Sequence, residues 1–360
     1  MAWARGGVQN DAVTAVAVIG GGLSGLAAAR VLRGLGWDIS VFEAGARLGG
    51  RSITESHGAA LFDTGAQFFR TEAPAVEELV LQSLPATDLV DIRSEVRPFT
   101  ADGAIGEGDP AQNGQPKWVY RRGIGQLGGL LARGSGAVVH LGWPCLRIQH
   151  SSGGWLVEGE AGRAGPFGAV VATLPPPALA PMIERSSFES GARQGLLAAI
   201  APSRYRPIVS VTFGFHRRPV LPGDIYALVN TDRAHAVSWL AFEHRKAGYV
   251  PPGHGVLTAQ MAADWSGPRL VTTDATLAAE ALDSVRSLLE EAVPTPAWTH
   301  VTRWPAALPD VLVEAERLRC AEHLGLFVAG DCASGGRVHL ALASGLEAGA
   351  RLVSWMDSRR

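Results

Sequence analysis

The chain has 360 residues, of which 47% are hydrophobic, so it is long enough to bury one large core or two domains. Its formal net charge of −2 excludes the strongly basic character of nucleic-acid-binding proteins and gives no case for an anionic membrane surface as partner. The cysteines Cys145, Cys320 and Cys332 are scattered without metal-ligand spacing, so we expect no metal, no structural disulfide and a reducing, cytoplasmic location.

The first predicted element is a buried strand, which follows a flexible tail over residues 1–12. An apolar run covers Val13–Ile19 and resumes after a short break, reaching Leu32. The whole stretch is as apolar as a membrane span or a signal core, but a glycine cluster lies where a spanning helix needs continuity. We therefore expect a strand, a turn and a helix rather than a membrane segment.

The glycine cluster has the context of a dinucleotide-binding fingerprint. Gly20-Gly21-Gly22-Leu23-Ser24-Gly25 opens a helix predicted over Leu23–Leu32, and Glu43 follows a second strand, Asp38–Phe42, about 20 residues later. Gly20 allows the tight turn, Gly22 lets the backbone approach a pyrophosphate, and Gly25 lets the helix pack on the strand. The helix N-terminus offers N–H groups to phosphates, and Glu43 can bind a ribose. The alternative is a glycine turn that serves packing alone.

Three further motifs indicate which dinucleotide is bound. The turn from Glu43 to Arg51 is rich in glycine and arginine, so its backbone can approach a ligand while Arg47 and Arg51 neutralise phosphates. Asp63-Thr64-Gly65-Ala66-Gln67-Phe68-Phe69 places small residues before aromatic ones, which suits a flat ring held against the backbone. Gly330-Asp331 ends a strand before a glycine turn and a helix, so Asp331 can bind ribityl hydroxyls and the helix N-terminus can stabilise negative charge on the ring.

Between these motifs, the pattern changes from a second part of the same domain to a sheet of another kind. From residue 178 onward, strand-like runs with aromatic residues alternate with loops, and an amphipathic helix over Thr276–Ala292 closes this part, which predicts an antiparallel sheet with helices. The other predicted helices are Gly123–Arg133 and Ala341–Met356. The other predicted strands are Ala137–Leu141, Leu146–His150, Trp155–Val157, Phe167–Leu174, Ile208–Phe215, Ile225–Asn230, Ala236–Phe242, Val256–Met261 and Leu326–Asp331.

Together the motifs resemble those of the flavin-containing amine oxidase superfamily, which has the glutathione-reductase-like FAD fold. The resemblance rests on the glycine fingerprint, Glu43, Arg47-Leu48-Gly49-Gly50-Arg51, Asp63-Thr64-Gly65-Ala66 and Gly330-Asp331. It implies an α/β fold: a Rossmann-like FAD-binding domain with an inserted α+β substrate domain built on an antiparallel sheet. We assign residues 13–70, 117–177 and 315–360 to the FAD-binding domain, and residues 71–116 and 178–314 to the substrate domain.

The resemblance also implies that FAD is the cofactor and which residues hold it. Monoamine oxidases attach the flavin through a cysteine near the C-terminal glycine turn. Here Arg337 follows that turn and Cys332 comes too early, so we expect non-covalent binding. The residues expected at the cofactor are Gly20, Gly22, Leu23, Ser24, Gly25, Glu43, Ala44, Arg47, Gly49, Gly50, Arg51, Gly65, Ala66, Gln67, Phe68, Cys145, Gly330, Asp331, Arg337 and Val338.

Within the superfamily, the chain is most similar to the renalase-like branch. The similarity rests on the segment Gly65–Phe69, on Arg121-Arg122-Gly123-Ile124-Gly125 and on the ending from Gly335 to Gly345. It implies hydride transfer from a small amine or dihydropyridine-type nitrogen compound to flavin N5, with O2 as electron acceptor. The alternatives are a protoporphyrinogen-oxidase-like, polyamine-oxidase-like or biosynthetic desaturase activity, or a flavin-binding protein without turnover. The oligomeric state stays open.

Five residues are candidates for the reaction itself: Lys246, Trp239, Trp304, His339 and Gln67. Lys246 is one of only two lysines among 32 lysines and arginines, and many amine oxidases hold a water beside flavin N5 with a lysine. Trp239 and Trp304 fall in the expected substrate domain, where aromatic rings can bind a planar or cationic substrate. The simpler interpretations are a solvated loop lysine, aromatic core residues, and a histidine at the surface or in the core.

Overall fold

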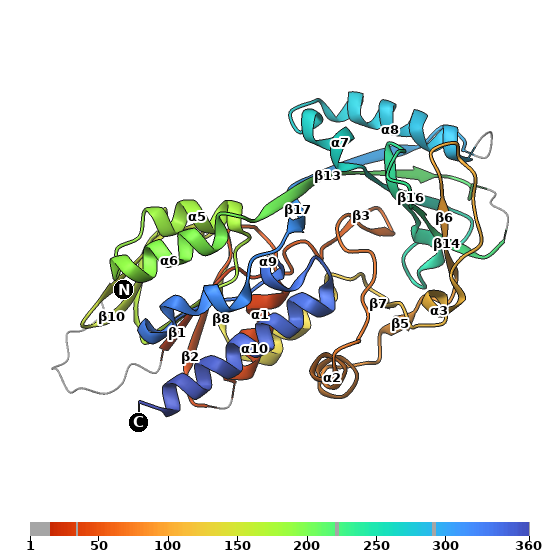
Figure 1. Ribbon diagram of the computed structural model, residues 1–360. Helices are drawn as coiled ribbons and strands as arrows, with labels where there is room; N and C mark the ends of the chain where they lie inside the picture. The colour runs from red at the N-terminus through yellow and green to blue at the C-terminus, as the bar shows by residue number, and fades with distance from the viewer. Residues whose placement is uncertain (1–14, 34, 220–222, 290–292, 360) are drawn as a thin grey trace.

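The computed structural model describes residues 15–33, 35–219, 223–289 and 293–359. The tail expected over residues 1–12 and the first two residues of the first predicted strand lie outside these ranges. The described chain forms two lobes, which the long strands β13 (Arg204–Phe215) and β17 (Trp298–Val311) connect (Figure 1). A Rossmann-like unit combined with a second, sheet-containing lobe confirms the fold class expected from the sequence.

The first lobe is built on a five-stranded parallel sheet with the order β18-β12-β1-β2-β8. Side chains of its central strand alternate between the two faces: Val16 and Val18 pack with helices α1, α4 and α10, while Ala17 and Ile19 pack with β10, α5 and α6. Because both faces are covered, the central strands are apolar throughout, which makes them recognisable in the sequence. The bounds are Ala15–Ile19 (β1), Asp38–Phe42 (β2), Val138–His140 (β8), Ala169–Ala172 (β12), Leu326–Val328 (β18), Leu23–Leu32 (α1), Gln126–Ser135 (α4), Pro176–Glu184 (α5), Ser190–Ile200 (α6) and Val338–Asp357 (α10).

The second lobe is a six-stranded sheet with the order β17-β13-β16-β15-β14-β6. Its neighbouring strands are antiparallel, as expected, except that β14 and β6 are parallel. Helix α8 covers one face of the sheet with Leu277 and Val285, while residues of the opposite face contact the segment Leu61–Phe69 of the first lobe. The remaining bounds are Glu95–Phe99 (β6), Ile225–Asn230 (β14), Val237–Phe242 (β15), Gly255–Met261 (β16) and Asp274–Leu289 (α8).

Shorter elements connect or extend the two sheets. The strands β9, β10 and β11 form an antiparallel sheet beside the parallel one, and the hairpin of β3 and β4 leads into the segment Asp63–Phe69. Over the described ranges, no helix combines the length and apolar character needed to cross a membrane. The bounds are Thr54–His57 (β3), Ala60–Asp63 (β4), Pro74–Glu77 (α2), Glu78–Ser83 (η1, a π-helix), Leu89–Asp91 (β5), Pro110–Asn113 (α3), Trp118–Tyr120 (β7), Cys145–Ser151 (β9), Gly154–Gly159 (β10), Gly162–Phe167 (β11), Glu243–Arg245 (η2), Ala263–Ser266 (α7), Gly267–Arg269 (η3), Ala315–Leu324 (η5) and Asp331–Ser334 (α9).

Some parts of the fold differ from the sequence-based expectation. Strand β17, helices α5 and α6 and the β3–β4 hairpin were not predicted. β17 carries Pro305 and Pro309, and most of its side chains are half-buried, so it shows neither an apolar run nor a clean alternation. Helix α5 begins within the three prolines that we expected only to end a strand, because proline is also favourable in the first turn of a helix.

Candidate active site

The predicted glycine fingerprint forms a tight turn between β1 and α1. Gly20 has a φ of 105°, a conformation that favours glycine, and its N–H donates to the Phe42 carbonyl at 2.8 Å. A Cβ atom at Gly25 would lie 2.1 Å from the Gly20 carbonyl oxygen, so a side chain there would push α1 away from the turn. A Cβ atom at Gly22 would meet nothing within 4 Å, so the backbone there faces open space.

The start of α1 suits a phosphate. Gly22 caps the helix without a side-chain hydrogen bond, so N–H groups of the first turn are available to a ligand. Ser24 is buried, and its Oγ has no hydrogen-bond partner among the residues that the structure describes. An orphaned hydroxyl beside free helix N–H groups fits phosphate oxygens, which accept hydrogen bonds from both. Leu23, the first residue of the helix, is buried.

The backbone fixes the carboxylate of Glu43 on both sides. Its Oε2 accepts the Gly21 N–H and its Oε1 accepts the Gly45 N–H, each at 2.7 Å. Each carboxylate oxygen can accept a second hydrogen bond, so Glu43 is both oriented and still able to bind a ribose hydroxyl. The neighbouring Ala44 is exposed.

The two arginines of the turn Glu43–Arg51 are each paired with a carboxylate. Arg47 pairs with Glu55 at the surface and donates to the Thr54 carbonyl at 3.1 Å. Arg51 makes a bidentate ion pair with Asp331, with Nη2 at 2.9 Å from Oδ1 and Nη1 at 2.8 Å from Oδ2. We expected both arginines to neutralise phosphates, whereas the structure pairs each of them with a carboxylate of the protein.

Asp331 connects the two lobes at this point. Tyr205 on β13 donates its hydroxyl hydrogen to Asp331 Oδ1 at 2.7 Å, and Arg51 Nη1 also reaches the carbonyls of Ala306 and Ala307 on β17 at 3.1 Å. Burial, followed by the charge of Asp331, raises the pKa of Tyr205, so its hydroxyl stays protonated and can donate. Residues of both lobes therefore meet at the carboxylate that we expected to bind ribityl hydroxyls.

Three of the predicted segments touch one another: the fingerprint turn Gly20–Gly25, the turn Glu43–Arg51 and the segment Asp63–Phe69. The Gly49 N–H donates to the Gly21 carbonyl at 2.8 Å, and the Ala66 N–H donates to the Arg51 carbonyl at 2.9 Å. A Cβ atom at Gly65 would lie 2.0 Å from the Arg51 carbonyl oxygen, so only glycine fits where the segment Asp63–Phe69 packs against the turn Glu43–Arg51. These hydrogen bonds connect the backbones of the three segments to one another. Gly50, next to Gly49, is exposed.

Side chains of the six-stranded sheet hold the segment Asp63–Phe69 in place. The Thr64 carbonyl accepts hydrogen bonds from Ser210 Oγ at 2.6 Å and from Trp304 Nε1 at 2.8 Å. The Gly65 carbonyl accepts one from Gln260 Nε2 at 2.5 Å. The hydroxyl of Thr64 itself is buried and has no partner within the described part of the chain. The loop is thus fixed by its carbonyls on the sheet side.

Beneath this loop lies a buried ionic cluster. Lys246 Nζ is 2.7 Å from Asp63 Oδ2, 2.8 Å from Glu243 Oε2 and 3.3 Å from Gln67 Oε1, and the three ionisable side chains have no exposed surface. Burial alone lowers the pKa of Lys246, but its acidic partners, Asp63 first, outweigh burial and raise the pKa. The interpretation of Lys246 as a solvated loop residue is therefore wrong.

Lys246 has three partners in the protein, which bears on the water that we expected this lysine to hold. Its ammonium group donates hydrogen bonds to Asp63 and Gln67 and forms an ion pair with Glu243 at 2.8 Å. Gln67 is also buried, and its Nε2 donates to the Asp63 carbonyl of its own loop. Lys246 and Gln67 thus support the loop from below.

Three aromatic rings lie beside the loop. The ring centroids of Phe68, Tyr226 and Trp239 are 6.1 to 6.2 Å apart, and the Tyr226 hydroxyl donates to the Gln67 carbonyl at 3.0 Å. Trp239 Nε1 is buried without a hydrogen-bond partner in the described ranges, so its N–H is available to a ligand. Trp304, on a different strand, uses its own N–H on the Thr64 carbonyl.

The N-terminus of α10 has no side-chain cap. Arg337 precedes the helix and is exposed, while Val338 and His339 are buried. His339 Nε2 lies 3.2 Å from Glu72 Oε2, and burial lowers the pKa of His339, which favours the neutral imidazole. Gly330, at the end of β18, has a φ of 138°, a value that favours glycine.

All three cysteines of the chain are free, and burial raises the pKa values of Cys145 and Cys332 to about 12. Cys145 lies on β9, close to Trp143, whose backbone N–H donates to the Glu43 carbonyl at 2.8 Å. In the described ranges, no group of three or more histidine, cysteine or acidic residues could hold a metal.

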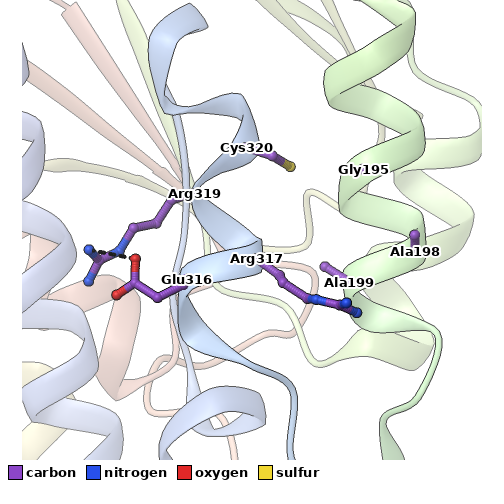
Figure 2. Close-up of a pocket in the computed structure, with 7 residues that line it drawn as sticks. All are labelled: Gly195, Ala198, Ala199, Glu316, Arg317, Arg319 and Cys320. Atoms are coloured by element: carbon purple, nitrogen blue, oxygen red, sulfur yellow. Dashed lines mark ion pairs between the residues drawn. The ribbon is translucent and has the colours of Figure 1, made fainter.

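A shallow cavity of about 530 Å³ lies elsewhere, between α6 and η5. Figure 2 shows Arg317 and Cys320 on the α6 side of η5, whereas Arg319 pairs with Glu316 on the other side. None of the predicted site residues lines this cavity, so the chemistry is to be sought at the junction of the lobes.

Comparison with known proteins shows the family of this chain. Residues 109–353 match the family model of flavin-containing amine oxidoreductases, and residues 18–82 match that of NAD(P)-binding Rossmann-like domains. The chain therefore belongs to the flavin-containing amine oxidoreductase family, and it is a flavin-dependent oxidoreductase.

Solved structures share the fold over nearly the whole chain. A protein from Exiguobacterium sp. 255-15 that carries the designation protoporphyrinogen oxidase has a TM-score of 0.78 and 16% identity, covering 97% of this chain and 100% of its own. Cyclohexylamine oxidase from Brevibacterium oxydans has a TM-score of 0.72 and 17% identity, with coverage of 95% and 99%. Putrescine oxidase, solved with putrescine bound, has a TM-score of 0.70 and 14% identity, with coverage of 94% and 98%.

Several residues of the site were not assigned from the sequence. Tyr249, Ser210 and Gln260 donate hydrogen bonds to residues of the segment Asp63–Phe69 that lie 146 or more positions away in the chain, and Glu243 pairs with Lys246. The available signal was weak: Ser210 is a polar residue within an apolar strand, and polar groups in such places need partners. Its partner could not be read from the sequence.

Proposed function

We propose that this chain is a renalase-like, FAD-dependent oxidase that acts on a small amine or dihydropyridine-type nitrogen compound and uses O2 as electron acceptor. FAD supplies the redox chemistry, accepting a hydride at N5 when it is bound. The observation that supports this proposal most strongly is that the segments Gly20–Gly25, Glu43–Arg51 and Asp63–Phe69 contact one another, and that the last of them packs against Tyr226 and Trp239 of the six-stranded sheet. We also propose a cytoplasmic location, since none of the three cysteines forms a disulfide.

The residues present fit FAD from end to end. Glu43 would bind the ribose of the adenosine half, and the start of α1 with Ser24 would bind the pyrophosphate. Asp331 would bind ribityl hydroxyls, and the Gly65–Gln67 backbone would contact the flavin ring. Non-covalent binding is supported by Cys332, whose side chain is 1% exposed and whose thiol is protonated.

The substrate would lie against Phe68 and Trp239. Aromatic faces attract a cationic or planar nitrogen compound, and the free Trp239 N–H can orient a substrate that carries an acceptor. The small-amine oxidases among the structural relatives support this class of substrate. We propose Trp304 and His339 as further contacts near the ring, and we assign Lys246 and Gln67 to positioning the loop.

The proposal is tested by the visible spectrum of the purified protein. We expect a yellow protein whose flavin absorption bleaches under anaerobic conditions with at least one member of a panel of small amines and dihydropyridines. Admission of air should restore the absorption and release peroxide. A protein that stays colourless after refolding with excess FAD would refute the cofactor, and a flavin that only a porphyrinogen reduces would favour the protoporphyrinogen-oxidase-like alternative.

A further inference from the structure

The buried ionic cluster has more carboxylates than cations. Lys246 contributes one positive charge, and Asp63 and Glu243 contribute two acidic groups, all without exposed surface. Burying an uncompensated charge is costly, and a buried acid can avoid that cost by keeping its proton. The partners of each acid indicate which one does so.

Asp63 has the partners of an ionised carboxylate. Its Oδ1 accepts hydrogen bonds from Thr54 Oγ1 at 2.6 Å and from the Ile124 N–H at 3.3 Å. Its Oδ2 accepts hydrogen bonds from Lys246 Nζ at 2.7 Å and from the Tyr249 hydroxyl at 2.8 Å. Four donors fill the acceptor capacity of a carboxylate, so the negative charge resides on Asp63.

Glu243 has far fewer partners. Its Oε2 lies 2.8 Å from Lys246 Nζ as an ion pair, but neither of its carboxylate oxygens has a hydrogen-bond partner among the described residues. On β16, the Thr258 hydroxyl bonds to the Thr212 hydroxyl at 3.1 Å. An acid with one ion-pair partner, no hydrogen-bond donor and no access to water holds its charge poorly.

The other titratable groups around Glu243 do not compensate its charge. Tyr226 on β14 and Tyr249 have pKa values raised by burial, so both stay neutral. The adjacent His244 has its pKa lowered to about 4 by burial, so it is neutral as well. Lys246 is thus the cation that the two acids share.

We propose that Glu243 carries a proton at neutral pH and acts as a positioning residue that fixes Lys246 beneath the loop Asp63–Gln67. Consistent with this, burial and the charge of Asp63 raise the pKa of Glu243 to about 7 despite the opposing effect of Lys246. Ionisation of Glu243 would leave the cluster with one uncompensated negative charge. That charge would oppose reduction of a flavin bound at the loop, so this consequence rests on the proposed function.

The proton on Glu243 can be observed by infrared spectroscopy of the purified protein, with or without bound flavin. We expect the wild type to show the stretching band of a protonated carboxyl group at neutral pH, and Glu243→Gln to lack it. Glu280→Gln is the matched control, because Glu280 is a half-exposed carboxylate that forms an ion pair with Arg269. A band that disappears only in Glu243→Gln supports the proposal. A wild type without the band, or a band that Glu243→Gln leaves in place, overturns it.

The link to the flavin is tested by the midpoint potential, measured from about pH 6 to about pH 8. Above about pH 7 we expect the potential of the wild type to fall more steeply with pH than that of Glu243→Gln, because Glu243 is then ionised and can bind a proton on reduction. Equal slopes would overturn the positioning role. If Glu243→Gln does not fold, the infrared titration of the wild type decides alone, and a wild type that binds no flavin refutes the proposed function without affecting the infrared result.

Discussion

Replacement of Lys246 by methionine tests whether this lysine is a structural cation. The side chains are of similar length, but the substitution leaves the buried Asp63 without its ammonium partner at 2.7 Å. Removing one partner of a buried ion pair typically costs about 3–5 kcal/mol, a large part of the ~5–15 kcal/mol that holds a domain folded. We therefore expect Lys246→Met to lose about 3–5 kcal/mol of unfolding free energy in urea.

The chain offers a matched control for this measurement. Lys117 is the other lysine, and it is also 1% exposed, but its Nζ donates to the Asn113 carbonyl at 3.2 Å rather than pairing with a carboxylate. Lys117→Met should cost only about 1–3 kcal/mol, the range for an unmade buried hydrogen bond. Adding Asp63→Asn to Lys246→Met should recover part of the loss. Equal losses in the two single lysine variants would refute the reasoning.

Three further outcomes follow from the site. Tyr205→Phe keeps the ring but removes the hydrogen bond to Asp331, so FAD affinity measured by fluorescence titration should fall roughly 2- to 10-fold; an unchanged affinity would exclude the hydroxyl from the cofactor site. Gly25→Ala should destabilise the protein strongly because of the 2.1 Å contact, whereas Gly22→Ala should keep its stability and lose FAD affinity; urea unfolding beside FAD titration separates them, and equal stability would contradict the packing role of Gly25. The pKa of Glu243 is raised from 4.5 to about 7 in the folded state, so its stabilising contribution is full below about pH 4.5 and is lost as pH rises to about 7, on the order of 3 kcal/mol. Glu243→Gln should remove this loss. If the assignment is wrong, the unfolding free energy in urea will change by the same amount between these two pH values in the wild type and in the variant.

The sequence alone was sufficient for the nucleotide-binding unit. A strand buried on both faces, a glycine turn and a helix are defined by neighbouring residues, so their pattern can be recognised without knowledge of the rest of the fold. The strand Ile225–Asn230 was predicted with the bounds that the structure shows, for the same reason. β17 was missed because its two prolines and half-buried side chains lack a strand period.

The sequence therefore determined the α/β fold and the family, and it predicts which loops would hold a flavin. Only the tertiary structure decided what each charged side chain does. Lys246 reaches Asp63 across 183 positions, and Arg51 reaches Asp331 across 280. Local patterns report which residues are buried, but the partner of a buried charge depends on which distant strands the fold brings together, and that partner fixes its protonation and its role.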